Sequence, residues 1–221
     1  MSNAGTIEQN LQSIRREIPE DVTVVAAGKT RDADDLSRAI DAGVSIVGEN
    51  YVQEARRVQR NLGDRAKDVS WHMIGHLQTN KINKALRLFD LIQTVDSLKV
   101  ARGISKRVEE TYPVYVQVNI GEEESKYGVM PDDAVEVIEQ VGGMENLLVE
   151  GLMTMEPYFE DPERARPYFR RMRELYDRLQ DDPPPGVELK VLSMGMTNSY
   201  RVAVEEGANM VRIGTAIFGP R

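Results

Sequence analysis

Two apolar segments near opposite ends of the sequence carry basic residues: a lysine follows the first, and an arginine lies within the second. Lys29 comes after residues 22–28, Val-Thr-Val-Val-Ala-Ala-Gly, and Arg212 lies in residues 211–219, Val-Arg-Ile-Gly-Thr-Ala-Ile-Phe-Gly. We expect Lys29 to be partly buried at a strand end, because burial disfavours the ammonium form and leaves an amine that can attack carbonyl groups. Small turns such as Gly214-Thr215 can surround a phosphate. Together these residues suit a ligand with an aldehyde and a phosphate.

A second small turn follows the preceding apolar segment. Residues 193–197 read Ser-Met-Gly-Met-Thr, and they supply the Ser193 hydroxyl and a glycine that lets the backbone approach a ligand closely. We expect Thr197 or Asn198 to be the N-cap of the next helix. The loops after the seventh and eighth strands form the recurrent phosphate site of (β/α)8 barrels. Ordinary turn chemistry is the alternative explanation of these residues.

Arg212 lies two residues before Gly214, so both residues face the same side of a strand. A guanidinium donates hydrogen bonds but cannot accept them. Facing a pyridine nitrogen, it would keep that nitrogen unprotonated and weaken the ring as an electron sink. A salt bridge at the rim is the alternative role for Arg212. An ion pair with Glu49 or Asp96 is the alternative for Lys29.

Two other patterns suggest chemistry that neighbouring residues do not support. Residues 28–30, Gly-Lys-Thr, resemble the end of a phosphate-binding P-loop, but Thr23 stands where that motif needs a glycine. His72 and His76 have the spacing of a zinc-binding helix, but Met73 replaces its glutamate and the chain has no cysteine. We therefore expect neither a nucleotide loop nor a metal site. His76 is interpreted as a neighbour of the ligand or as a capped loop residue.

The pattern of apolar residues predicts eight strands that alternate with helices. Residues 6–18 form an amphipathic helix ahead of the first strand, because Ile7, Leu11, Ile14 and Ile18 recur every three or four positions. The predicted strands are residues 22–26, 45–48, 71–74, 91–95, 114–120, 148–153, 188–193 and 210–213. The predicted helices between them are residues 33–42, 51–62, 79–88, 98–110, 131–141, 162–179 and 199–206.

This alternation favours an α/β fold with a single (β/α)8 TIM barrel and an extra N-terminal helix over a doubly wound sheet. A final helix is short or missing, and the leading helix is expected to cover that gap. Catalytic and binding residues of such barrels lie at the C-terminal ends of the strands. The polar segment 121–128 follows one such end, and it is either a mobile lid or a solvated loop.

Size and composition limit the class of protein. The 221 residues suit one domain over residues 1–221, because single barrels of this kind run to roughly 200–250 residues. The net charge of -8 argues against a nucleic-acid partner, and no segment approaches the roughly 18 apolar residues of a membrane span. The absence of cysteine excludes disulfides and thiol catalysis. With no secretory signal at the N-terminus, we expect a cytoplasmic protein, and we expect a monomer.

Six segments spread over nearly the whole chain match one known family, and these are residues 48–55, 71–81, 95–98, 151–154, 193–196 and 212–219. They resemble the pyridoxal phosphate homeostasis proteins, the family that includes bacterial YggS and the human proline synthase co-transcribed homologue. Two departures are Ala27-Gly28, where many members carry Val-Ser, and Thr197-Asn198, where acidic residues are frequent.

The resemblance implies a barrel like that of alanine racemase, of the PLP fold type III kind, with pyridoxal 5'-phosphate (PLP) held by Lys29 as a Schiff base. It further implies that Arg212 faces the pyridine nitrogen and that Ser193, Gly214 and Thr215 bind the phosphate. Asn50 and Met194 match positions that line the pocket.

The implied function is to carry or buffer PLP without established catalysis, and PLP-dependent apo-enzymes are the candidate recipients. We expect no second domain of the kind with which racemases of this fold deliver an opposing acid–base group, because the predicted barrel uses the residues of this sequence. A weakly active amino-acid racemase or decarboxylase that uses PLP is the first alternative. A cofactor-free Schiff-base lyase that acts on a sugar phosphate is the second.

Overall fold

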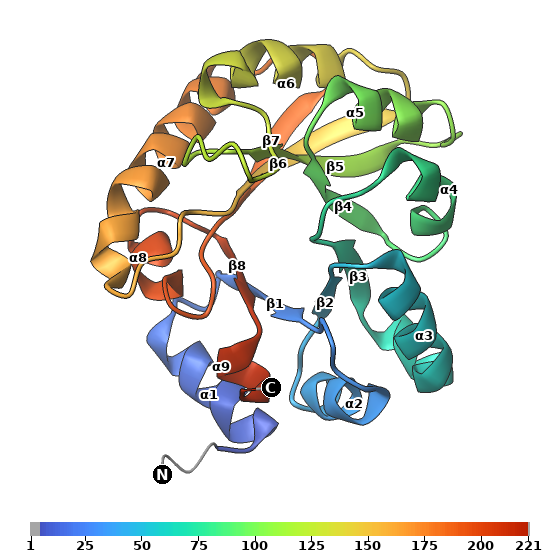
Figure 1. Ribbon diagram of the computed structural model, residues 1–221, viewed down its shortest axis with the longest axis vertical. Helices are drawn as coiled ribbons and strands as arrows, with labels where there is room; N and C mark the ends of the chain where they lie inside the picture. The colour runs from blue at the N-terminus through green and yellow to red at the C-terminus, as the bar shows by residue number, and fades with distance from the viewer. Residues whose placement is uncertain (1–4, 221) are drawn as a thin grey trace.

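Eight parallel strands form a closed barrel in the computed structural model, which describes residues 5–220 (Figure 1). The strands are β1 (Thr23–Ala27), β2 (Ile46–Glu49), β3 (Ser70–Met73), β4 (Leu91–Val95), β5 (Tyr112–Val118), β6 (Leu147–Thr154), β7 (Val187–Ser193) and β8 (Met210–Ile213). Pairing of β1 with β8, with Thr23 opposite Met210 and Ala26 opposite Ile213, closes the ring. The predicted (β/α)8 barrel is confirmed.

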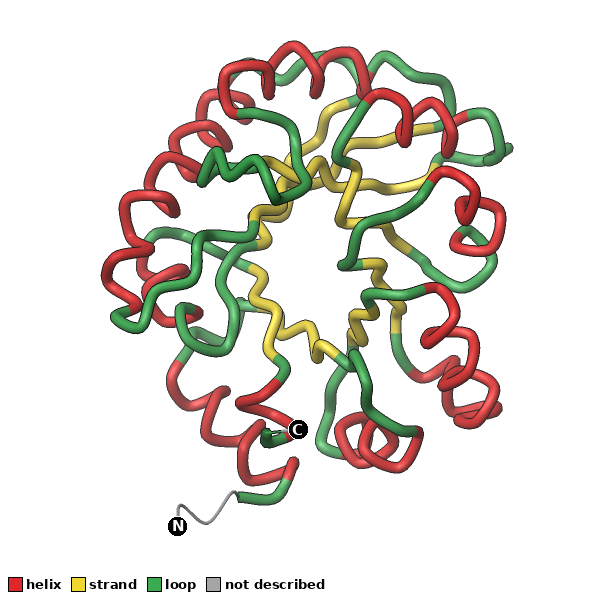
Figure 2. Tube along the Cα trace, in the orientation of Figure 1, coloured by secondary structure: helices red, strands yellow, loops and turns green. Residues whose placement is uncertain are grey.

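Helices surround this ring of strands, as Figure 2 shows. The α-helices are α1 (Ile7–Glu17), α2 (Ala33–Asp41), α3 (Val52–Leu62), α4 (Ile82–Ala85), α5 (Leu98–Ser105), α6 (Ala134–Gly142), α7 (Arg166–Asp181), α8 (Tyr200–Glu205) and α9 (Thr215–Phe218). Four 3-10 helices accompany them: η1 (Gly63–Asp68), η2 (Thr79–Lys81), η3 (Pro131–Asp133) and η4 (Pro162–Ala165). No helix among residues 5–220 combines the length and the apolar character needed to cross a bilayer.

The leading helix α1 lies beside the short last helix α9, as the sequence predicts (Figure 1). Its first turn is fixed by a capping box in which Gln9 N donates to the Thr6 hydroxyl and Thr6 N donates to Gln9 Oε1. The amide of Asn10 donates to the carbonyl oxygen of Ile217 over 2.8 Å. The predicted extra helix therefore completes the outer layer where the last βα unit is short.

Two helices are much shorter than their predicted ranges. The range 79–88 contains η2 and only one turn of α-helix, and residues 86–88 form a turn in which Leu86 N donates to the Ile82 carbonyl oxygen and Leu88 N to that of Ala85. The range 98–110 ends as a helix at Ser105, because Ile104 is its last buried residue and a polar segment follows. The six-residue 3-10 helix η1 was not predicted, since its residues have no apolar period.

The barrel interior is partly polar near its C-terminal mouth. Val25, Leu91, Tyr115, Met153 and Met210 form a separate buried cluster, while a much larger apolar cluster lies between strands and helices. Four buried polar side chains share the interior with the smaller cluster, and these are His72, Gln93, Ser193 and Arg212. Their hydrogen bonds fix the position of the arginine singled out by the sequence.

Candidate functional site

A cavity of about 610 Å³ opens at the C-terminal ends of the strands and brings together Lys29, Asn50, Arg212, Gly214 and Thr215. Its remaining walls come from the β6–α7 loop and from the turn at residues 196–199. We call it the Lys29 cavity. Five of the predicted site residues therefore lie around one space, although they come from three strand ends that are distant in sequence.

Lys29 is exposed, so the predicted partial burial of this side chain is wrong. The reason is that β1 ends at Ala27, and residues 28–30 form a turn outside the barrel, with Thr30 at a positive φ of 67°. The alternative ion pairs do not form within residues 5–220. Asp96 accepts from His76 Nδ1 at 2.7 Å, and Glu49 is buried beneath the turn.

The Glu49 carboxyl occupies the space that a side chain at position 28 would need. A Cβ added to Gly28 would lie 2.9 Å from Glu49 Oε1, so the glycine of the Ala27-Gly28 pair leaves room for this carboxyl. Glu49 is 1% exposed, and its Oε2 has no hydrogen-bond partner among the described residues. Burial, followed by the nearby Glu54 carboxylate, raises the pKa of Glu49 to about 8.

Arg212 lies inside the barrel mouth, in place of the rim salt bridge considered as an alternative. Its Nη1 donates to Ser193 Oγ over 2.7 Å, and its Nη2 donates to the Thr154 carbonyl oxygen over 2.6 Å. Burial lowers the pKa of Arg212 to about 10, an effect that the nearby Glu156 carboxylate opposes. The guanidinium therefore keeps its proton at neutral pH and presents donors to the Lys29 cavity.

Ser193 holds Arg212 and does not line the cavity. Its hydroxyl is fully buried, accepts from Arg212 and donates to Gln93 Oε1 over 2.8 Å. Gln93 Nε2 in turn lies 2.8 Å from His72 Nδ1. Met194 is also fully buried and packs in the larger apolar cluster. These two predicted site residues support the cavity wall from behind.

The turn after β7 is tied to both neighbouring loops. Gly195 has a φ of +91°, and a Cβ there would lie 2.5 Å from the Ala203 Cβ, so a glycine is required. Thr197 Oγ1 accepts from Ala216 N over 3.3 Å, and Asn198 Nδ2 donates to the Phe159 carbonyl oxygen over 2.7 Å.

The predicted N-cap at Thr197 or Asn198 is wrong, because α8 begins at Tyr200 and its N-cap is Ser199, without a side-chain cap. Both predicted residues are instead used to connect this turn to its neighbours. The Thr197 hydroxyl still lines the Lys29 cavity, close to the first residues of α9.

Glu156 lines the same cavity and was not singled out in the sequence. It is 4% exposed, one carboxylate oxygen accepts from the Ser199 hydroxyl, and Oε2 is buried without a hydrogen-bond partner within residues 5–220. The only available signal was its position two residues after the end of β6. That signal is weak, since a glutamate in a loop is ordinarily solvated.

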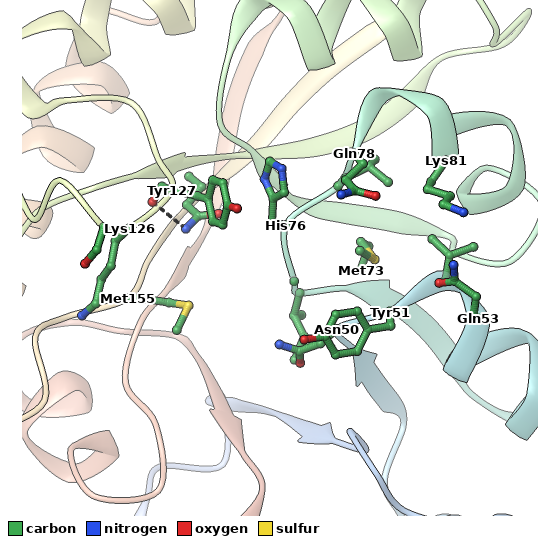
Figure 3. Close-up of a pocket in the computed structure, with 16 residues that line it drawn as sticks. Asn50, Tyr51, Gln53, Met73, His76, Gln78, Lys81, Lys126, Tyr127 and Met155 are labelled. Carbon is green, nitrogen blue, oxygen red and sulfur yellow. Dashed lines mark hydrogen bonds between the residues drawn. The ribbon is translucent and has the colours of Figure 1, made fainter.

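His76 lines an adjoining cavity of about 490 Å³, the His76 cavity, which shares Asn50, Ile74 and Met155 with the first. The Tyr127 ring stacks on the His76 ring with centroids 3.6 Å apart. Figure 3 shows this pair between Lys126 and Lys81, which lie on opposite sides. His76 is thus separated from Lys29 by the shared residues, and its contact with a ligand of the Lys29 cavity stays a prediction.

The segment 121–128 forms part of the wall of the His76 cavity. Gln117 Nε2 donates to the Tyr127 carbonyl oxygen over 3.0 Å, and Asn119 Nδ2 donates to that of Glu123 over 2.9 Å. Lys126 pairs with Glu123 at 2.6 Å and donates to the Glu156 carbonyl oxygen over 3.2 Å. The loop contains the local Glu–Lys pair expected of a solvated loop, and the mobile lid stays a prediction.

The family model described as "Alanine racemase, N-terminal domain" matches residues 2–221. A pyridoxal phosphate homeostasis protein of Aquifex aeolicus is 42% identical over 201 residues, which cover 90% of this chain and 86% of that protein. The chain belongs to the pyridoxal phosphate homeostasis protein family. The resemblance seen in the sequence is thereby confirmed.

Solved structures agree with this membership. PipY of Synechococcus elongatus PCC7942, in a structure with PLP bound, is 31% identical with a TM-score of 0.87, and the match covers 97% of this chain and all of PipY. An alanine racemase of Clostridium difficile 630 is 18% identical with a TM-score of 0.77. That match covers 98% of this chain but 56% of the racemase, and it shows a shared barrel fold.

Proposed function

We propose that this chain binds PLP in the Lys29 cavity and carries or buffers it, with Lys29 as the Schiff-base residue. One observation carries the proposal: an amine at the end of β1, a buried guanidinium on β8 and two small turns with hydroxyls line a single cavity. The PLP bound in PipY and the names of the relatives support the same ligand.

Each group in the cavity has a separate task in this proposal. Bound PLP supplies an aldehyde and an electron-withdrawing ring. Arg212, held by Ser193 and Thr154, faces the ring nitrogen and offers it only donors, so the nitrogen stays unprotonated. Gly214, Thr215 and the Thr197 turn hold the phosphate through backbone N–H groups and hydroxyls. Asn50 and, from the adjoining cavity, His76 limit the space around the ring.

The test is covalent trapping of PLP. The purified protein with PLP should show a visible absorption band, and borohydride should leave one phosphopyridoxyl label on Lys29. Lys29→Ala should lose both signals, whereas Lys81→Ala, which changes a lysine of the adjoining cavity, should keep them. A label on another lysine in the unaltered protein contradicts the proposal.

The adjoining His76 cavity favours a second candidate, a weak PLP-dependent racemase or decarboxylase. It gives an amino acid space beside Asn50, Ile74 and Met155, the residues shared with the Lys29 cavity. Deuterium exchange at the amino-acid Cα that needs both PLP and Lys29 would support racemisation, and release of carbon dioxide would support decarboxylation. The carrier function predicts neither at a sustained rate.

The proposal extends to the state and partners of the protein. We expect a cytoplasmic monomer with one PLP-binding domain over residues 1–221, which supplies PLP-dependent apo-enzymes. Sedimentation equilibrium and cell fractionation measure the first two properties. Mixing the PLP-loaded protein with an apo-enzyme, with a scavenger for free PLP present, measures the transfer.

A further inference from the structure

Glu156 places a carboxylate without a counter-ion on the wall of the Lys29 cavity. It is the one acidic side chain that lines either cavity in the part of the chain described, residues 5–220. Its Oε1 accepts from the Ser199 hydroxyl, and its buried Oε2 accepts from no group there. A buried oxygen of this kind loses its hydration without compensation, so a donor supplied by a ligand would stabilise it.

The charged groups around Glu156 do not neutralise it directly. Arg212 on β8 gives Nη1 and Nη2 to Ser193 and Thr154. Lys126, from the β5–α6 loop, contacts only the Glu156 carbonyl oxygen and is paired with Glu123. Lys29 lines the cavity from the β1–α2 turn but forms no ion pair with Glu156 within residues 5–220. The attraction of Arg212 acts through space alone.

The bond to Ser199 brings the Glu156 carboxylate beside the turn that would hold a phosphate. The Ser199 hydroxyl also accepts from Met196 N over 3.1 Å, so Glu156, Ser199 and the 196–199 turn form one connected unit. A phosphate dianion on this turn would face a second anion, the buried Glu156 carboxylate. Two such groups cannot both stay fully ionised, and the pair holds one proton more firmly than either group alone.

We propose that Glu156 and the ligand phosphate share a proton, so that phosphate binding in the Lys29 cavity is coupled to the uptake of one proton from solvent. The inference rests on the proposed function. The free phosphate has a second pKa near 6 and a free glutamate one near 4.3, so both are mostly ionised at pH 7.5. With the proton taken up on binding, the affinity falls about tenfold for each unit of rising pH.

This coupling gives the carrier a means of release. As the pH rises, the proton becomes harder to take up from solvent, and repulsion between the carboxylate and the phosphate weakens binding. A Glu156→Gln substitution replaces the anion by an amide that keeps an acceptor for Ser199 and can donate to the phosphate. It should therefore bind phosphate ligands more tightly at high pH.

Calorimetry with pyridoxine 5'-phosphate isolates this effect, because that compound carries the phosphate but has no aldehyde for Lys29. Titration at pH 7.5 in two buffers of different ionisation enthalpy should show uptake of about one proton by the unaltered protein. Glu156→Gln should show almost none and should bind about tenfold more tightly at pH 8. Glu160→Gln, an exposed change in the same loop, should behave like the unaltered protein.

Each outcome decides one of the two proposals. Heat that is independent of the buffer in the unaltered protein overturns the shared proton, even if Glu156→Gln does not fold. Proton uptake retained in Glu156→Gln, or weaker binding by that variant, overturns it as well. If PLP is trapped at Lys29 in any of these cases, the proposed function stands. Absence of binding by both PLP and pyridoxine 5'-phosphate overturns both.

Discussion

Arg212 donates through Nη1 to the Ser193 hydroxyl over 2.7 Å, and this hydroxyl donates onward to Gln93 over 2.8 Å. A hydroxyl has one hydrogen, so its direction is set: it accepts from the guanidinium and donates to the amide oxygen. This series of hydrogen bonds ends at His72, whose Nδ1 lies 2.8 Å from Gln93 Nε2. Residues of β3, β4 and β7 thus orient a cation on β8.

Replacing Ser193 with alanine should destabilise the protein and loosen Arg212. The substitution leaves a buried charged donor and the Gln93 oxygen without partners, at a cost of about 2–3 kcal/mol in the free energy of unfolding. Urea denaturation measures the change. Ser105→Ala is the matched control, because the Ser105 hydroxyl bonds to an exposed carbonyl oxygen and its loss should cost about 0.5 kcal/mol or less. Equal effects of the two variants would refute this role for Ser193.

The barrel was predictable because its strands are short apolar runs separated by amphipathic helices. The range predicted for β4 is correct at both ends, and that for β8 is as well. Errors occur where local pattern does not decide the end of an element. Leu86 and Leu88 continue an apolar helical period, yet the α-helix ends at Ala85 and residues 86–88 form a turn before β4.

The candidate site was predictable to the extent that its residues follow strand ends. Lys29, Arg212 and Thr215 were found in this way and share a cavity. Contacts between distant residues could not be found. Nothing near Ser193 in the sequence indicates that the Ser193 hydroxyl will donate to Gln93. Nothing near Glu156 indicates that the Glu156 carboxylate will accept from Ser199.

A Gly195→Ala substitution should damage the turn after β7. Its φ of +91° is strained for alanine, and the new Cβ would lie 2.5 Å from the Ala203 Cβ. Gly63→Ala is the matched control, since Gly63 also has a positive φ, of +60°, but no atom of residues 5–220 lies within 4 Å of an added Cβ. The control should lose about 1–3 kcal/mol of stability, because its backbone conformation is one that alanine rarely adopts. Gly195→Ala should lose more and should bind PLP more weakly, and equal losses would show that Ala203 yields without cost.

The buried Glu49 should make the protein less stable as the pH rises. Its pKa is raised from 4.5 to about 8, so the folded state holds a proton that the unfolded state releases between these values. The contribution of Glu49 to the free energy of unfolding is fully present below pH 4.5 and is lost as the pH rises towards 8. Glu49→Gln should remove this dependence, on the order of 5 kcal/mol, from unfolding free energies measured across that range. Glu139→Gln, an exposed change on α6, should leave it intact.

The buried His72 should make the protein less stable as the pH falls. Burial lowers its pKa from 6.5 to about 4, so the ring stays neutral and Nδ1 can accept from Gln93. In the unfolded chain the His72 ring binds a proton below pH 6.5, whereas in the folded protein it stays neutral down to about pH 4. The free energy of unfolding therefore decreases across this interval as the pH falls. His72→Gln should flatten that part of the profile, whereas His76→Gln should keep the His72 contribution. An imidazole NMR signal of His72 that titrates near pH 6.5 would disprove the neutral ring and, with it, the direction of the hydrogen bonds that hold Arg212.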